Sequence, residues 1–75
     1  VVDEVAFQRM DARLASFLAT RARVQNPIRI THAEIASELG SSREVITRLL
    51  EDLSARGFVR VGRGQIEVLD EAGLE

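Results

Sequence analysis

A short stretch in the middle of the chain carries two helix starts separated by one glycine, and this spacing constrains the fold more than any other feature. Thr31 and Glu34 have the spacing of a capping box, in which a hydroxyl and a carboxylate bind free amides at the start of a helix. Gly40 then suits the left-handed turn that ends a helix. Ser41 and Glu44 repeat the capping-box spacing directly after this turn. We therefore predict two short helices joined by a tight turn.

The apolar residues of these two segments fall on one face of each predicted helix. The stripe of the first helix is Ile35, Ala36 and Leu39, and that of the second is Ile46, Leu49, Leu50 and Leu53. Ala36 is small enough for the helices to approach closely where they cross, and Gly57 ends the second helix. Such a pair, with arginines on the second helix, is the helix-turn-helix pattern.

The flanking segments complete a small domain. Residues 2–24 have the spacing of an amphipathic helix, which Asp11 could divide in two by capping a second helix. Asn26-Pro27 ends this stretch, and residues 28–30 can form a short strand. After the second short helix, two segments of alternating polarity flank Gly62-Arg63-Gly64, as in a β-hairpin; they are Phe58–Val61 and Gln65–Leu69. Residues 70–75 can add a final helical turn.

These elements predict a mainly α-helical domain with a small antiparallel sheet. The fold class is a winged helix-turn-helix, with a three-helix core and a β-hairpin wing. A chain of 75 residues forms one small domain at most, and its 45% hydrophobic content suffices for a thin core. The chain begins without methionine inside an amphipathic pattern, so we interpret it as a fragment of a longer protein.

Composition argues against several other classes of protein. The chain has no cysteine, one histidine and no glycine-rich phosphate loop before a helix, so we predict no enzyme, no metal site and no cofactor within it. No apolar run approaches the roughly 20 residues of a membrane helix, and no signal peptide is present. These features fit a cytoplasmic protein without a membrane partner.

The distribution of charge is more informative than the net charge of −2. Residues 43–63 carry five arginines against three acidic residues, whereas residues 64–75 carry four acidic residues and no basic one. Every basic residue is arginine, whose planar fork suits paired contacts to guanine and phosphate. A GC-rich genome would also favour arginine, and both explanations stay open.

The outward face of the second short helix carries the candidate DNA-reading residues. Arg43 and Arg48 can donate to O6 and N7 of guanine, and Glu44 can accept from N4 of cytosine. The alternative is a solvated helix face with a Glu44–Arg48 pair, worth only about 0.2–0.5 kcal/mol. The two helix starts, Ala36 and Gly40, and the following hairpin favour base reading.

The run "ITHAEIASELGSSREVITRLLEDLSARG" resembles the Crp/Fnr family of transcription regulators, and "VRVGRGQIEVLD" looks like the wing of that family. "VAFQRMDARLASFL" looks like the end of its dimerisation helix, a hinge and the first helix of its DNA-binding domain. The resemblance implies that residues 1–10 end a dimerisation helix and form a hinge, and that residues 11–75 are the DNA-binding domain. It also implies base contacts by Arg43, Glu44 and Arg48, with Thr47 where one subgroup reads a base.

The partners implied by this resemblance are double-stranded DNA, a second copy of the full-length protein and RNA polymerase. A sensor domain would precede this chain, so its effector cannot be read from these residues. Ala33 and Val45 depart from the family pattern, because neither side chain can hydrogen-bond a phosphate. Polar and basic residues at the helix starts and on the wing are the candidate phosphate contacts: Thr31, His32, Ser41, Ser42, Arg60 and Arg63.

Three choices stay open from the sequence. Arg60 and Arg63 are phosphate clamps or ordinary hairpin charges, and His32 is a phosphate-side or solvent residue rather than a metal ligand. The N-terminal stripe is a dimer seam before Gln8 or part of the core; it comprises Val2, Val5, Phe7 and Met10, and we expect Leu14, Phe17 and Leu18 in the core. The alternative function is a winged-helix protein-interaction module that does not bind DNA.

Overall fold

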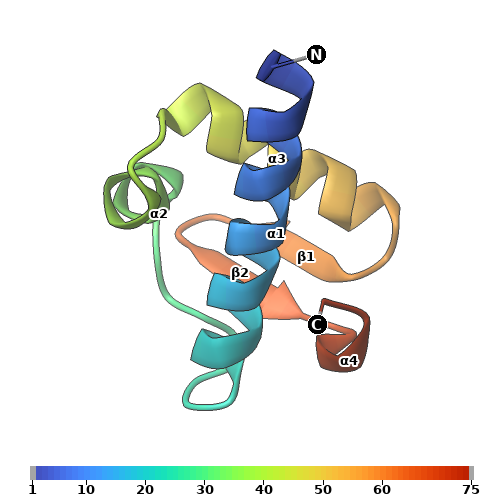
Figure 1. Ribbon diagram of the computed structural model, residues 1–75. Coiled ribbons are helices and arrows are strands. Elements are labelled where there is room, and N and C mark those ends of the chain that lie inside the picture. Colours follow the sequence, from blue (N-terminus) through green and yellow to red (C-terminus); the bar gives the residue numbers. More distant parts are fainter. Residues whose placement is uncertain (1, 75) are drawn as a thin grey trace.

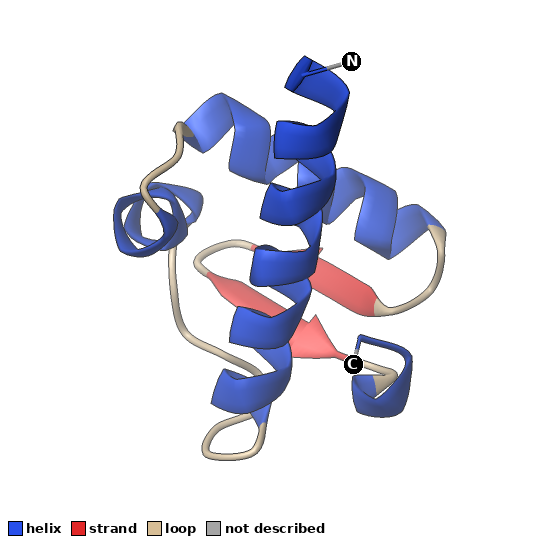
Figure 2. Cartoon of the chain, in the orientation of Figure 1, coloured by secondary structure: helices blue, strands red, loops and turns tan. Residues whose placement is uncertain are grey.

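The computed structural model describes residues 2–74, with side chains from residue 10 onward, and it confirms the predicted winged helix-turn-helix fold (Figures 1 and 2). Three helices surround a common core, and a two-stranded antiparallel hairpin closes it. In chain order the elements are α1 (Val2–Ala22), α2 (His32–Leu39), α3 (Arg43–Ala55), β1 (Val59–Gly62), β2 (Gln65–Val68) and α4 (Glu71–Leu74).

The core draws apolar side chains from every element of the fold. Among the described residues, no polar or charged residue is buried, so the interior is held by apolar packing alone. The largest fully buried side chains come from α1, α2, α3 and both strands: Leu14, Leu18, Ile35, Ile46, Leu49, Leu50, Val59 and Ile66. The first two of these confirm the predicted core face of α1, and Phe17 lies half-buried against the same core.

Helix α1 is one continuous helix, so the predicted division at Asp11 is wrong. The apolar spacing runs through this position, and Met10 and Leu14 on either side of it both pack on the same core. An N-cap would require extended backbone at Asp11, which would move these two side chains apart. The helix ends at Ala22, where the amides of Val24 and Gln25 turn back to the Arg21 carbonyl oxygen at 3.0 and 2.9 Å. The side chains of Val2, Val5 and Phe7 lie outside the described residues.

The first short helix has the predicted capping box. The Glu34 amide donates to the Thr31 hydroxyl oxygen at 3.1 Å, and the Thr31 amide donates to Glu34 Oε1 at 3.0 Å. Gly40 ends α2 with φ of +69°, the left-handed conformation that the sequence predicted. Hydrogen bonds from the Thr31 backbone and side chain lower the pKa of Glu34 below its ordinary value of 4.5.

This lowered pKa predicts a small pH dependence of stability. A carboxylate whose pKa is lowered by folding stabilises the protein above its unfolded pKa, and this contribution is lost as the pH falls through the folded value. We expect the urea unfolding midpoint of the wild type to fall more steeply below pH 4.5 than that of Glu34→Gln, which cannot ionise. If the unfolding midpoints of the two proteins changed in parallel with pH, the Glu34 carboxylate would contribute nothing to the pH dependence of stability.

The second short helix begins one residue later than the second capping-box spacing implied. Its N-cap is Ser42 rather than Ser41, and the Ser42 hydroxyl accepts the Val45 amide at 3.3 Å. The third helical residue is therefore Val45, which has no carboxylate to return the bond, and Glu44 stays exposed. The predicted second capping box is thus only half formed. The helix ends as predicted, with Gly57 at φ of +83° just beyond it.

The hairpin forms as predicted, with a tighter turn. Gly62 pairs with Gln65, so Arg63 and Gly64 alone make the turn, and Gly64 takes a φ of +69°. The predicted strand at residues 28–30 is reduced to one bridge, in which Ile28 and Ile66 exchange two backbone hydrogen bonds of 2.8 Å.

The side chain of Asn26, which the sequence predicted only as the end of the first helical stretch, stabilises this bridge. Asn26 Nδ2 donates to the Val68 carbonyl oxygen, and Asn26 Oδ1 accepts the Val68 amide, both at 2.9 Å. The side chain thus satisfies both backbone groups at the end of β2. Together with the Ile28–Ile66 bridge, it ties the wing to the segment that precedes α2.

Replacing Asn26 should therefore loosen the wing. We expect Asn26→Ala to lower the free energy of unfolding by about 1–2 kcal/mol, because two backbone groups of Val68 lose their partner. Asn26→Asp keeps the acceptor for the Val68 amide but loses the donor, so its loss should be similar to or larger than that of alanine at neutral pH. Chemical denaturation measures both, and an unchanged midpoint for Asn26→Ala would show that water replaces the side chain without cost.

Candidate nucleic-acid interface

The first two turns of α3 present the candidate base-reading residues to solvent. Arg43, Glu44 and Arg48 are exposed, whereas the opposite face of the helix is buried against the core through Ile46 and Leu49. The helix is thus held by its apolar stripe, which leaves the charged side chains turned outward. That these three residues contact bases stays a prediction.

The outward charges are available for a partner. Among the described residues, the ion pairs of α3 involve its C-terminal end, where Arg56 Nη2 lies 3.1 Å from Asp52 Oδ2. The structure records no ion pair between Glu44 and Arg48, although their spacing would allow one. The solvated Glu44–Arg48 pair of the alternative interpretation is therefore not formed.

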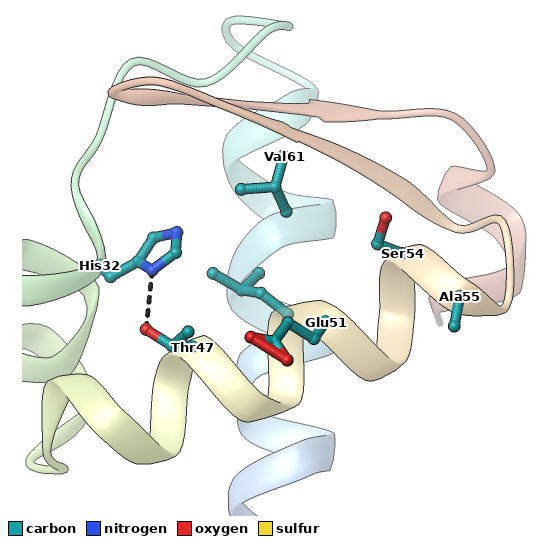
Figure 3. Close-up of a pocket in the computed structure, with 7 residues that line it drawn as sticks. His32, Thr47, Glu51, Ser54, Ala55 and Val61 are labelled. Carbon is teal, nitrogen blue, oxygen red and sulfur yellow. Dashed lines mark hydrogen bonds between the residues drawn. The ribbon is translucent and has the colours of Figure 1, made fainter.

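Thr47 differs from its neighbours because it is half-buried and already hydrogen-bonded. Its Oγ1 lies 2.9 Å from Nδ1 of His32, which is half-buried at the first position of α2 (Figure 3). We predicted both residues at the interface, Thr47 as a base contact and His32 as a phosphate contact, but not the hydrogen bond between them. No local signal could reveal this contact, because it joins two helices across 15 positions of the chain.

Between α3 and β1 the surface is hollowed over about 440 Å³. Thr47, Leu50 and Glu51 line it from α3, Val61 from β1, and His32 from α2 (Figure 3). Its lining is mainly apolar, with polar groups from His32 and Thr47 at the end nearest α2, from Glu51 in the middle and from Ser54 farther along α3. The hollow therefore lies between α3 and the first strand of the hairpin.

The remaining phosphate candidates at the helix starts are mostly engaged within the fold. The Thr31 and Ser42 hydroxyl oxygens accept helix amides, so they act first as caps. Ser41 is half-buried, and its amide donates to the Ala36 carbonyl oxygen at 2.8 Å. The hydroxyl hydrogen of Ser42 and the free amides of the α3 amino end remain suited to an anion.

The two arginines of the wing differ in their surroundings. Arg60 faces Glu67 across the hairpin, with Nη1 and Oε1 3.5 Å apart and both side chains substantially exposed. Arg63 lies in the exposed turn and has no ion-pair partner among the described residues. In Figure 1 the turn of the hairpin lies on the same side of the molecule as α2 and the first turns of α3. Arg63 is thus the better placed of the two for a phosphate.

Other kinds of site lack support in the described part of the chain. Residues 2–74 contain no group of three or more side chains that could hold a metal ion. In the same range, no helix has the length and apolar character needed to cross a bilayer.

The helix pair, the hairpin and the exposed arginines define a winged helix-turn-helix of the DNA-binding class. Residues 12–75 match the Crp-like helix-turn-helix domain, and the chain belongs to this family. This confirms the Crp/Fnr resemblance of the sequence, and the family is that of the DNA-binding domains of transcription regulators.

Several regulators resemble the chain in sequence. It is 32% identical over 82 residues to the transcriptional regulator SdrP of Thermus thermophilus, covering 99% of this chain and 41% of that protein. It is 46% identical over 46 residues to the cyclic AMP receptor protein of the same bacterium, covering 61% of this chain and 21% of that protein. The chain thus spans less than half the length of these relatives.

The likeness extends to three-dimensional structure. The crystal structure of the Thermus thermophilus catabolite activator protein matches with a TM-score of 0.86 and 35% identity, over 97% of this chain and 35% of that one. TTHA1359, a regulator of the CRP/FNR family from the same organism, matches with a TM-score of 0.81 and 31% identity, over 97% of this chain and 42% of that one. The arrangement of α2, α3 and the hairpin is therefore that of solved regulators.

Proposed function

We propose that this chain is the sequence-specific DNA-binding domain of a Crp/Fnr-type transcription regulator, and that α3 enters the major groove. The observation that carries the proposal is the outward face of α3, where Arg43, Glu44 and Arg48 are exposed while the other face is buried. The amino-terminal turns of such a helix are the part that reaches base edges.

Each side chain of this face has a role that follows from its chemistry. The guanidinium groups of Arg43 and Arg48 donate to O6 and N7 of guanine, and the Glu44 carboxylate accepts from N4 of cytosine. Thr47 contributes a hydroxyl to the same surface. Contacts to phosphate come from the amino ends of the two short helices and from the wing, through Thr31, His32, Ser41, Ser42, Arg60 and Arg63.

The whole regulator is proposed to act as a homodimer on a two-fold symmetric operator. Residues 1–10 would belong to the end of its dimerisation helix and to the hinge, and the continuous helix α1 runs without a break from Val2 into the DNA-binding domain of residues 11–75. As part of the same proposal, the whole regulator contacts RNA polymerase and is located in the cytoplasm. A single copy of this chain should bind weakly, because it lacks the gain from joining two half-sites.

Selection from a random pool of double-stranded DNA at low salt tests the proposal. Enrichment of related sequences, with inverted repeats when the dimeric protein is used, is the expected result. Retention of no DNA would favour the second candidate, a winged-helix module that binds only protein. Arg43 and Arg48 have no ion-pair partner among the described residues, which argues against that candidate.

The wing provides an independent check. We expect Arg63→Ala to weaken binding to cognate and random DNA alike, and to reduce the slope of log affinity against log salt by about one. Arg60→Ala is the matched variant on the same hairpin, and its effect should be smaller because Arg60 lies against Glu67. A loss confined to the cognate sequence would contradict the assignment of Arg63 to phosphate.

A further inference from the structure

The hydrogen bond between His32 and Thr47 joins the start of α2 to the second turn of α3. Nδ1 of the ring and Oγ1 of the threonine are 2.9 Å apart, and both side chains are half-buried. Figure 3 shows the second ring nitrogen of His32 on the side of the ring away from Thr47. The ring therefore presents one nitrogen to α3 and leaves the other for a different partner.

The protonation of Nδ1 decides what the Thr47 hydroxyl can offer. A hydroxyl has one hydrogen to donate and lone pairs to accept with. If Nδ1 carries no hydrogen, it accepts the hydroxyl hydrogen, and Oγ1 can then only accept from a further group. If Nδ1 carries a hydrogen, it donates to Oγ1, and the hydroxyl hydrogen becomes free for another acceptor. The imidazolium ion has hydrogens on both nitrogens and allows only the second arrangement.

We propose that His32 is a positioning residue that sets whether Thr47 acts as an acceptor or a donor towards a base of the DNA. The inference rests on the proposed function, in which α3 lies in the major groove. Nε2 is the ring nitrogen that lies away from Thr47. If Nε2 contacts a phosphate oxygen of the DNA, it must carry a hydrogen, because phosphate oxygens only accept hydrogen bonds. In the neutral ring Nδ1 is then unprotonated and holds the Thr47 hydrogen. The His32 ring thus couples a contact to the phosphate backbone of the DNA with a contact to one of its bases.

The two states of Thr47 favour different bases. As an acceptor, Oγ1 matches the amino groups at N6 of adenine and N4 of cytosine. As a donor, the hydroxyl matches O6 and N7 of guanine, O4 of thymine and N7 of adenine, so cytosine is the one base that only the acceptor state matches. Histidine side chains ordinarily change charge between about pH 5 and pH 8. Acidification should therefore exchange the base preference at the position that faces Thr47.

Among the described residues, few other charged groups near the His32 ring could make the base preference depend on pH. From α3, Glu51 is the charged residue that lines the same hollow as His32. From β1 the hollow is lined by Val61, which carries no charge. On α2 itself, the Glu34 carboxylate is turned to the Thr31 amide. Glu51 is therefore the group to remove in a control variant.

The experiment measures base preference at two pH values. A binding site is first selected from random DNA at about pH 8, and each of its positions is then tested with all four base pairs at about pH 8 and about pH 5, the two ends of the usual histidine range. For the wild type we expect the affinity for cytosine at one position per half-site to fall relative to guanine and thymine when the pH is lowered, by roughly two- to tenfold.

Four variants separate the positioning role from a structural one. His32→Gln, which does not titrate, and Thr47→Val, which has the same shape without a hydroxyl, should both lose the exchange. Thr47→Ser and Glu51→Gln should both keep it. Thermal melts establish that each variant is folded. If His32→Gln fails to fold, Thr47→Val alone still tests the proposal, since loss of the exchange is expected there too.

A histidine that only binds phosphate gives a different result. Its protonation would raise the affinity for every sequence and leave base preference unchanged, and that outcome would overturn the proposal. Nitrogen-15 spectra of the ring in the DNA complex give a second readout: at about pH 8 the hydrogen is expected on Nε2, and finding it on Nδ1 would also overturn the proposal. If no sequence is enriched at all, the proposed function itself fails. An enriched site with preferences that do not depend on pH refutes only the role of His32.

Discussion

Ile46→Ala is expected to destabilise the domain by about 2–5 kcal/mol, because it removes a fully buried side chain where α3 packs on the core. A chain of 75 residues has a total stability of only about 4–11 kcal/mol. The substitution therefore removes a large share of it and should lower the melting temperature by roughly 10–30 °C. Because the outer face of α3 depends on this stripe for its orientation, DNA binding should be lost along with the fold on warming.

The matched control for this substitution is Val24→Ala. The Val24 side chain is 88% exposed, so its truncation should change the free energy of unfolding by less than about 0.5 kcal/mol. Thermal and urea unfolding of both variants measures the difference. Equal stabilities for Ile46→Ala and Val24→Ala would mean that α3 is not held by its apolar stripe.

Arg48→Ala is expected to weaken binding to the selected DNA site by roughly 5- to 150-fold, which corresponds to about 1–3 kcal/mol. The side chain is exposed on the outward face of α3, so the fold should be unaffected. The loss should fall on one G·C pair, and at that position the variant should accept other base pairs nearly as well. Titration of the protein against sites changed at single positions measures both effects.

Arg56→Ala controls for the loss of one positive charge from the same helix. Arg56 is exposed near the C-terminal end and pairs with Asp52, away from the turns that face the groove. We expect its affinity to change by less than about threefold. If Arg48→Ala weakened binding to all sequences equally, Arg48 would contact phosphate rather than a base.

Patterns within a few residues of one another predicted most of this fold correctly. The apolar spacing of α2 and α3, the Thr31–Glu34 capping box and the glycine turns each depend on neighbouring residues, and the structure confirms them. Local spacing misled where two overlapping signals competed. Ser41 and Ser42 can both cap a helix, and in the structure Ser42 does so, with its hydroxyl accepting the Val45 amide. Asp11 likewise lost its predicted role because the apolar stripe of α1 continues through it.

Contacts between distant parts of the chain could not be predicted in this way. Asn26 reaches the end of β2 across 42 positions, and His32 reaches Thr47 across 15. A single polar residue before a proline, or at the first position of a helix, has many plausible partners until the fold fixes its neighbours. At the candidate interface, the sequence therefore predicted that Arg43, Glu44 and Arg48 face outward, but not that Thr47 is half-buried against His32.

The attachment of the hairpin to the segment before α2 has a consequence for the DNA. Because Asn26 and the Ile28–Ile66 bridge hold that segment against β2, the span between the tip of the hairpin and α3 is set by the protein. A duplex that engages both must bring its phosphates to this fixed span by bending or by changing its groove width. Sequences that deform easily would then be favoured even at base pairs that no side chain reaches.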